Sequence, residues 1–491
     1  MVSSRVLIRV IGLVSTVVLV RLLRPEDFGL VTLAMALVGV LEVCGEFNFD
    51  LALIREGRAT RDHYDTVWTL SLIRGALVSV ALVLLAAPAA HFFGDPRIQA
   101  VIYCFAIMPF LEGMQNVGIV DFRKELNFHR EFTLQVAVKL ITFVVTLTFA
   151  ILWRQYWALV IGIVVGKVIN VGLTYGMHPY RPRPSLSEWR SLVGFSKWLL
   201  LHNISSFLTE RFDTFAIGRI VGTYAVGLYD VANEIASLPK GELIWPIQRA
   251  LFPGYAKLME ERDHLASSYL GSLGVITMIA LPAAVGIACV AHLIVDVFLG
   301  PQWQNALPLL RVLAIAGILN VAYVNAQTAL LALGRAQILS YLSLINLAIF
   351  VPLVVVGTLL AGPVGTAFAV VTTAAILLVI YIAITLRVLS TRFSELMTAI
   401  WRSLASAVLM ALSLHALMAA FPETQSSFSE AVELLVCIAA GALIYVGAHL
   451  ALWRLVGLPP GAEMHLLGAL ASLTQRWRAR LGWGSTDAPT P

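Results

Sequence analysis

Charged residues are scarce in this chain: they make up 13% of its 491 residues, whereas hydrophobic residues make up 59%. The mean hydropathy is +0.84. A soluble domain cannot cover so much apolar surface, so the composition excludes a soluble protein and indicates an integral membrane protein. Alternating strand patterns of about ten residues are also missing, and the apolar runs are about 20 residues long. Both observations favour membrane-spanning helices.

Cysteines are few, and motifs that bind nucleotides are missing. The cysteines Cys44, Cys104, Cys289 and Cys437 lie far apart within apolar runs. This spacing excludes a redox pair or a cysteine metal site and is typical of small buried apolar residues. No phosphate-binding glycine motif occurs, so direct use of ATP is not expected. The net charge of +5 is small and scattered, so we expect no nucleic-acid partner. We also expect no cofactor and no metal.

The apolar runs predict an all-α, polytopic protein with about fourteen membrane-spanning helices. They lie near residues 2–23, 28–49, 66–93, 98–120, 132–152, 155–177, 197–219, 224–248, 268–298, 305–333, 336–360, 363–386, 397–420 and 431–456. If the N-terminus is cytoplasmic, the cytoplasmic loops hold sixteen arginines and lysines and the opposite loops hold six. This asymmetry follows the positive-inside rule, so we predict that both termini are cytoplasmic.

A sequence motif near the first loop returns in altered form 198 residues later. Residues 21–30 read RLLRPEDFGL and residues 219–228 read RIVGTYAVGL, and each copy is followed by an alanine at the same distance, Ala34 and Ala232. Membrane proteins built from two similar halves usually move a substrate through the cleft between them. An even number of spans per half predicts two parallel, pseudo-symmetric six-helix lobes, with two additional helices at the C-terminus.

The proline-rich segment 178–184 divides the two predicted lobes. We predict a first lobe over residues 1–178, a cytoplasmic linker with an interfacial helix over 179–193, and a second lobe over 194–390. The added spans occupy residues 391–457. Residues 458–491 are predicted to form a cytoplasmic amphipathic helix, with leucines and a tryptophan on one face beside arginines, and a disordered tail.

With these motifs in view, the chain resembles the polysaccharide-transport branch of the multidrug/oligosaccharidyl-lipid/polysaccharide exporter superfamily, the Wzx-like flippases. The matching pieces are residues 21–29, the pattern Gly227-Leu-Tyr-x-x-Ala232, and Phe252-Pro253. The order of spans also matches, so the resemblance covers nearly the whole chain. Members usually carry a basic segment before the first span, and here only residues 1–5 stand in its place.

The resemblance implies alternating access by two lobes around a central cavity, lined mainly by spans one, two, seven and eight. The implied cargo is an undecaprenyl-pyrophosphate oligosaccharide repeat unit, moved from the cytoplasmic to the outer leaflet of the bacterial inner membrane. Such transport serves the biosynthesis of lipopolysaccharide, exopolysaccharide or capsule. A polysaccharide polymerase or assembly complex and membrane lipids are the implied partners.

Ionisable residues inside a membrane cost at least about 2.5 kcal/mol each on insertion scales, so each needs a reason. Six intramembrane cations are candidates for binding a pyrophosphate, because their side chains can hold phosphate oxygens. They are Arg9, Arg74, Lys139, Lys167, Arg211 and Lys240. For Arg9, Arg74 and Lys139 the alternative is snorkelling to the cytoplasmic surface, whereas Lys167 lies in the middle of its span.

Four intramembrane acids are candidates for ion coupling or for counter-charges. They are Glu42, Glu46, Asp213 and Glu234. The repeat offset of 198 relates Glu42 to Lys240, which suggests a pair of opposite charges across the cavity. Asp213 is a candidate for titration in a proton- or sodium-coupled cycle, and a local ion pair with Arg211 is the alternative.

Other functions are less consistent with the sequence. An enzyme such as a membrane glycosyltransferase would use acidic residues in its first outer loop, but that loop is about four residues long and its repeat copy has no acid. We therefore expect no catalytic residues. A drug/cation antiporter of the same superfamily is the main alternative, although cavity cations argue for an anionic cargo. A flippase for the peptidoglycan lipid precursor also remains open.

Overall fold

The structure is a computed structural model that describes residues 2–44, 53, 60–124, 128–189, 197–258, 261–421, 427–458 and 463–464. These residues form helices joined by short loops, and the described part contains no strand. The first half of the chain contains α1 (Val2–Leu22), α2 (Pro25–Cys44), α4 (Arg61–Phe93), α5 (Arg97–Phe105), α6 (Ile107–Gly113), η1 (Val117–Ile119), α7 (Val120–Lys124), α8 (Phe128–Trp153) and α9 (Trp157–Met177).

The second half begins with α11 (Lys197–Ile220) and α12 (Thr223–Ala236). The π-helix η2 (Lys240–Ile244), α13 (Trp245–Lys257), α14 (Arg262–Cys289), α15 (Ala291–Ile294), the π-helix η3 (Val295–Leu299) and the 3₁₀-helix η4 (Pro301–Ala306) follow. The long helices α16 (Leu307–Ala332), α17 (Ala336–Leu389), α18 (Phe393–Ala420) and α19 (Ser427–Leu455) come next. The all-α fold predicted from the apolar runs is confirmed.

Among the described residues, 8 helices are long and apolar enough to cross a membrane. One of them, α17, contains two of the predicted spans. Its backbone leaves helical geometry at Ala361 and at Gly362, whose φ is +58°, and this break lies between the spans predicted to end at 360 and to begin at 363. Gly357 and Gly365 touch closely, so the two parts lie side by side. The count of fourteen stays a prediction.

The chain divides into two compact units. Unit 1 contains Met1–Ala232, Val295–Leu309 and Ser343–Val370, and unit 2 contains Asn233–Ile294, Leu310–Leu342 and Val371–Pro491. Unit 1 therefore combines helices from both halves of the repeat. The lobe boundaries predicted from the sequence stay a prediction.

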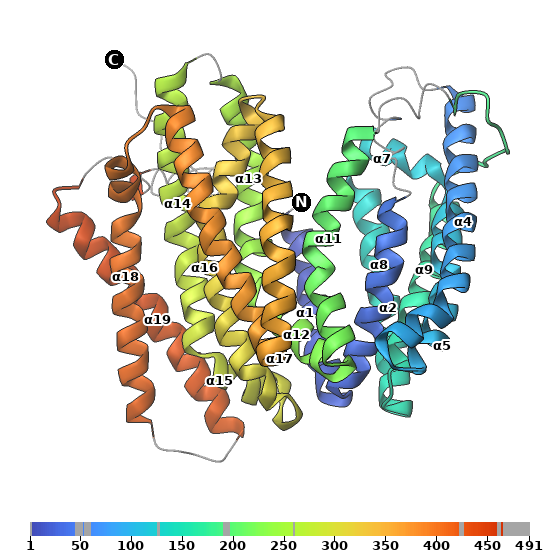
Figure 1. Cartoon of the computed structure of the whole chain (residues 1–491), viewed down its shortest axis with the longest axis horizontal. Coiled ribbons are helices and arrows are strands. Elements are labelled where there is room, and N and C mark those ends of the chain that lie inside the picture. The colour runs from blue at the N-terminus through green and yellow to red at the C-terminus, as the bar shows by residue number, and fades with distance from the viewer. Residues whose placement is uncertain are drawn as a thin grey trace, which may run out of the picture. The chain divides into compact units, whose positions relative to one another are not determined.

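In unit 1, α8 packs against α1 and α9, α4 packs against α5 and α6, and α2 packs against α5 and α11 (Figure 1). Small residues allow the close approach of α8 and α9. A Cβ atom at Gly162 would lie 1.9 Å from the hydroxyl oxygen of Thr146, and one at Gly166 would lie 2.5 Å from that of Thr142. This is the usual means by which transmembrane helices approach, because lipid provides no hydrophobic drive.

Unit 2 has a buried core in which α14 packs against α18 and α19. Buried polar side chains in this core satisfy one another, as they must in a low-dielectric interior. The hydroxyl of Tyr255 donates to Asn325 at 3.0 Å, and the Asn325 amide donates to Ser272 at 3.3 Å. At the chain's end, Arg402 of α18 makes a bidentate ion pair with Glu463, at 2.8 and 3.1 Å.

Candidate functional site

A cavity of about 630 Å³ lies within unit 1. Its walls come from α2, α6, η1, α7, α8 and α9, and two of the predicted cations, Lys139 and Lys167, line it. Polar side chains add to the lining: Gln115, Glu131, Gln135, Thr142 and Asn170. The remaining lining is apolar, with Met35, Met108, Val120 and Phe122 among it. A mostly apolar cavity with a few convergent polar groups is the usual form of a ligand site.

Lys167 lies on α9 and forms an ion pair with Glu112 of α6, with 2.6 Å between Nζ and Oε2. Both side chains are about one-third exposed, Lys167 at 30% and Glu112 at 35%. The glycine at position 166 brings α9 close to α8 beside this lysine. The pair is therefore accessible from the cavity, and an incoming anion can compete with Glu112 for the ammonium group.

Lys139 lies on α8 and is exposed. A Cβ atom at Gly12 of α1 would lie 3.9 Å from its Nζ, so α1 passes beside the ammonium group. Among the described residues, no carboxylate lies within ion-pair distance of Lys139. Its positive charge is thus available for a ligand.

A second feature, which we call the glycine crossing, joins the N-terminal turns of α2 and α12. A Cβ atom at Gly29 would lie 1.8 Å from the carbonyl oxygen of Thr223, and a Cβ atom at Gly227 would lie 1.8 Å from that of Pro25. Each contact is the repeat image of the other, since both residue pairs are related by the offset of 198. The two halves of the repeat therefore meet here around a pseudo-two-fold axis.

Polar contacts extend the glycine crossing. The hydroxyl of Thr32 donates to Asp230 at 2.9 Å, and these two residues are also 198 apart. The guanidinium of Arg211 lies 3.7 Å from the other carboxylate oxygen of Asp230. The predicted cation Arg211 therefore has an ion-pair partner on α12.

The predicted acid Asp213 is buried in α11. It accepts hydrogen bonds from the hydroxyl of Tyr229 at 2.7 Å and from the backbone N–H of Thr214 at 2.7 Å. A buried carboxylate needs such donors, because an unpaired one is costly in a dry interior. Tyr229 thus contacts the candidate Asp213, and Asp230 contacts the candidate Arg211. The sequence analysis selected neither Tyr229 nor Asp230. The repeat offset from Thr32 to Asp230 was the signal available for the latter.

The sequence motif at residues 21–30 adds further contacts beside the glycine crossing, and we call this region the closed end. Arg21 donates to the carbonyl oxygens of Asp296, Val297 and Phe298 at the end of η3, where a cation complements the helix dipole. The indole N–H of the fully buried Trp303 donates to the carbonyl of Val20 at 3.0 Å. Residues from both halves of the chain therefore pack tightly where α1 ends and α2 begins.

The other predicted site residues are not among the described residues that line the cavity. Arg74 is half-buried in α4 of unit 1, and Glu42 lies near the end of α2. Lys240 lies in the π-helix η2 and Glu234 in α12, both in unit 2. The side chain of Arg9 and all of Glu46 lie outside the described residues. The proposed pairing of Glu42 with Lys240 stays a prediction, because the two belong to different units.

Comparisons with known proteins agree with this architecture. Residues 18–308 match the model of a family described as polysaccharide biosynthesis protein. The lipopolysaccharide biosynthesis protein WzxC of Escherichia coli (strain K12) is 26% identical over 374 residues, covering 74% of each chain.

Two solved structures share the fold. The lipid II flippase MurJ, in an inward closed conformation, has a TM-score of 0.73 at 14% identity and covers 92% of this chain and 98% of that one. An inward-facing multidrug resistance MATE family transporter of the MOP superfamily has a TM-score of 0.57 at 17% identity, covering 77% and 94%. Since the family model spans more than half of the sequence, this multi-pass membrane chain belongs to the polysaccharide biosynthesis protein family.

Proposed function

We propose that this protein is a flippase that moves a polyprenyl-pyrophosphate-linked oligosaccharide from the cytoplasmic to the outer leaflet for surface polysaccharide biosynthesis. The observation that carries the proposal is the cavity in which Lys139 and Lys167 face a common space. The family and the fold support transport and not glycosyl transfer. The chain is not an enzyme.

The lining chemistry supports an anionic, sugar-bearing headgroup. The two ammonium groups attract phosphate oxygens, and the amides of Gln115, Gln135 and Asn170 can exchange hydrogen bonds with sugar hydroxyls. Glu112 pairs with Lys167 when no cargo is present, so the ammonium group is not a bare charge before loading, and the cargo phosphate then competes with Glu112 for it. A cationic drug would meet two ammonium groups against the single carboxylate of Glu131 in the described part of the cavity lining, which disfavours the drug antiporter.

The closed end at the glycine crossing supports alternating access. We place it on the outer side of the membrane, as the positive-inside rule requires for loops near residues 24 and 222. Both termini are then cytoplasmic. Cargo enters from the cytoplasmic side, which is opposite to the glycine crossing. Arg211 and Asp213 act in the closure in this proposal, and Arg9, Arg74 and Lys240 remain candidate phosphate ligands. Coupling to protons or sodium is a proposal that rests on Asp213, Glu42, Glu46 and Glu234.

The test is flipping in proteoliposomes of a polyprenyl-pyrophosphate oligosaccharide with a labelled sugar, detected by an impermeant sugar-modifying reagent. Lys167→Ala should reduce the initial rate by at least about tenfold, since charge-assisted phosphate contacts contribute about 1.5–3 kcal/mol. The matched control is Lys257→Ala, which removes an exposed lysine at the end of α13. Absence of flipping by the unsubstituted protein, together with drug/proton exchange in the same vesicles, would transfer the assignment to the antiporter.

The role of ions is tested in the same vesicles. Dissipation of the proton and sodium gradients should slow flipping if Asp213 or one of the glutamates titrates during the cycle. An unchanged rate would remove the coupling proposal and leave the flippase intact.

A further inference from the structure

The proline-rich connector between the halves is bound along the first half of the protein. Its first residue, His178, leaves α9 in an extended conformation, with φ −126° and ψ 133°, and residues 178–186 contain no helix or strand. Three elements hold it: α4, η1 and α7. An extended segment has no internal hydrogen bonds between backbone groups, so its position depends on side chains and on these outside partners.

On α4 the partners are Asp65 and Thr69. The carboxylate of Asp65 accepts from the hydroxyl of Tyr180 and, at 2.8 Å, from the backbone N–H of Arg183. Thr69 accepts from the backbone N–H of Ser185 at 2.9 Å. Burial, and then the hydrogen bond to Asp65, raise the pKa of Tyr180, so its hydroxyl stays protonated as a donor.

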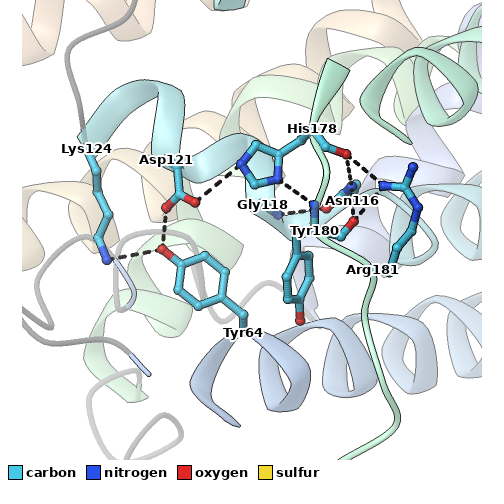
Figure 2. A network of polar contacts seen from close by, with 8 residues as sticks. All are labelled: Tyr64, Asn116, Gly118, Asp121, Lys124, His178, Tyr180 and Arg181. Carbon is cyan, nitrogen blue, oxygen red and sulfur yellow. Dashed lines mark hydrogen bonds and ion pairs between the residues drawn. The ribbon is translucent and has the colours of Figure 1, made fainter. Parts of the chain in front are cut away.

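At η1 the connector meets the buried side chain of Asn116. Its amide nitrogen donates to the carbonyl of Tyr180 at 2.8 Å, and its amide oxygen accepts from the backbone N–H of Gly118 at 2.9 Å. Figure 2 shows the side chains of Asn116 and Arg181 beside the carbonyl oxygens of His178 and Tyr180. Arg181 folds back and donates to the carbonyl of His178 at 2.7 Å, which satisfies an end group of α9.

At α7 the connector is held through the imidazole of His178. Its Nδ1 accepts the backbone N–H of Tyr180 at 3.2 Å, so the ring proton must be on Nε2, which faces Asp121 at 3.5 Å (Figure 2). Asp121 also accepts from the hydroxyl of Tyr64, to which Lys124 donates at 3.3 Å. The imidazole thus bridges the connector and α7.

The same short segment forms part of the cavity wall. Ile119, Val120 and Phe122 line the cavity, whereas Gly118 and Asp121, between and beside them, contact the connector. The Phe122 ring packs edge-to-face on the imidazole of His178, with 5.7 Å between ring centroids. Any displacement of the connector therefore changes the support of this wall.

We propose that the connector, through His178, Gly118 and Asp121, holds the η1–α7 wall of the cavity in the shape that accepts cargo. His178 and Asp121 are positioning residues for the cargo site, and the effect on cargo rests on the proposed function.

Glycine substitutions test this coupling with a matched pair. A Cβ atom at Gly118 would lie 2.1 Å from Nδ1 of His178, so Gly118→Ala must displace the imidazole. Gly176 lies in α9, two residues before His178, and its Cβ atom would meet nothing within 4 Å. Gly176→Ala is therefore the control.

Two readouts report the connector and the cavity separately. Spin labels at the exposed positions Asp62 and Pro184 measure the distance from α4 to the connector. A cysteine at Gln135, in a background without other cysteines, measures access to the cavity by its rate of maleimide labelling. Neither readout depends on the cargo.

In Gly118→Ala we expect a shifted distance, a labelling rate changed by roughly fivefold or more, and a KM for the lipid-linked oligosaccharide raised by a similar factor with little change in maximal rate. His178→Phe, which keeps the ring but removes both nitrogens, should do the same, and His178→Gln should restore part of the loss. A purely structural role would lower the amount of folded protein without this division between KM and maximal rate.

A shifted connector with unchanged labelling and KM would overturn the proposal. So would an unshifted connector in Gly118→Ala, because the contact on which the argument rests would then be absent. If the unsubstituted protein flips no such lipid, the proposed function fails. The labelling result still decides whether the connector controls the cavity wall.

Discussion

The glycine crossing makes a quantitative prediction about closure. A Cβ atom at position 29 would lie 1.8 Å from a backbone oxygen, whereas ordinary contact begins at 3.4 Å. In Gly29→Ala the two helices must therefore move apart by more than 1 Å or distort. Overpacking of this kind costs about 1–3 kcal/mol, and alanine returns up to about 1 kcal/mol through its helix propensity. The state in which α2 and α12 touch is destabilised, and the open state is not.

The assay measures access to the cavity from the side of the membrane on which Gly29 lies. A cysteine at Met35, about 9 Å further along α2, is labelled by an impermeant maleimide in a background without other cysteines. A shift of 1–3 kcal/mol predicts labelling that is roughly 5- to 150-fold faster in Gly29→Ala. Gly227→Ala should behave alike, because the two contacts are repeat images.

Gly172→Ala is the control, since its Cβ atom would meet nothing within 4 Å in α9. Gly172→Ala changes only the helix propensity at this position and should leave the labelling rate unchanged. Folded Gly29→Ala protein that is labelled no faster than the parent would refute the reasoning. The close contact of α2 with α12 would then not limit access.

Other buried polar contacts can be tested by single substitutions or by pH. Tyr229→Phe removes the donor to buried Asp213 and should lower the free energy of unfolding by about 1–3 kcal/mol; an unchanged Tm of the purified protein would contradict this contact. Trp303→Phe removes a buried indole N–H bond and should destabilise by a similar amount, about 1–3 kcal/mol, again measured as Tm. For Glu463, burial by itself raises the pKa, but the bonds from Arg402 lower it below the ordinary value. Because a depressed pKa stabilises the ionised state, docking of Glu463 on α18 should be complete above about pH 4.3 and be lost as the pH falls further. A spin-label distance between this segment and α18 that does not lengthen in acid would contradict the ion pair.

The repeat in the sequence anticipated more of the site than the individual charges did. The offset of 198 between Gly29 and Gly227 marked two positions that the fold brings into direct contact. The same offset connects Thr32 with Asp230. Positions related by a two-fold axis can touch only close to that axis, so these pairs locate it. The sequence identified the repeat, but it did not indicate which repeated positions lie on the axis.

Charge alone was a weaker guide. Lys139 and Lys167 were both selected as isolated intramembrane cations, and the fold places both in one cavity. Arg211 was selected for the same reason, yet it faces Asp230 at the closed end. The free-energy cost of placing a charged side chain inside the membrane is a property of that residue, whereas the partner that offsets this cost comes from another helix. Sequence reasoning therefore selected candidate residues and could not assign their partners.

The sequence by itself determined that this protein is an all-α membrane protein with a repeated architecture, because apolar length and periodic composition depend only on local residue order. It also indicated where α17 breaks, since glycine and proline act locally. Only the tertiary structure decided which charges share a cavity, that Glu112 holds Lys167, and that the connector is bound to the cavity wall. The ion pair of Glu112 with Lys167 and the contact of His178 with Asp121 join residues that are 55 or more positions apart. Their geometry arises from helix packing, which no local pattern records.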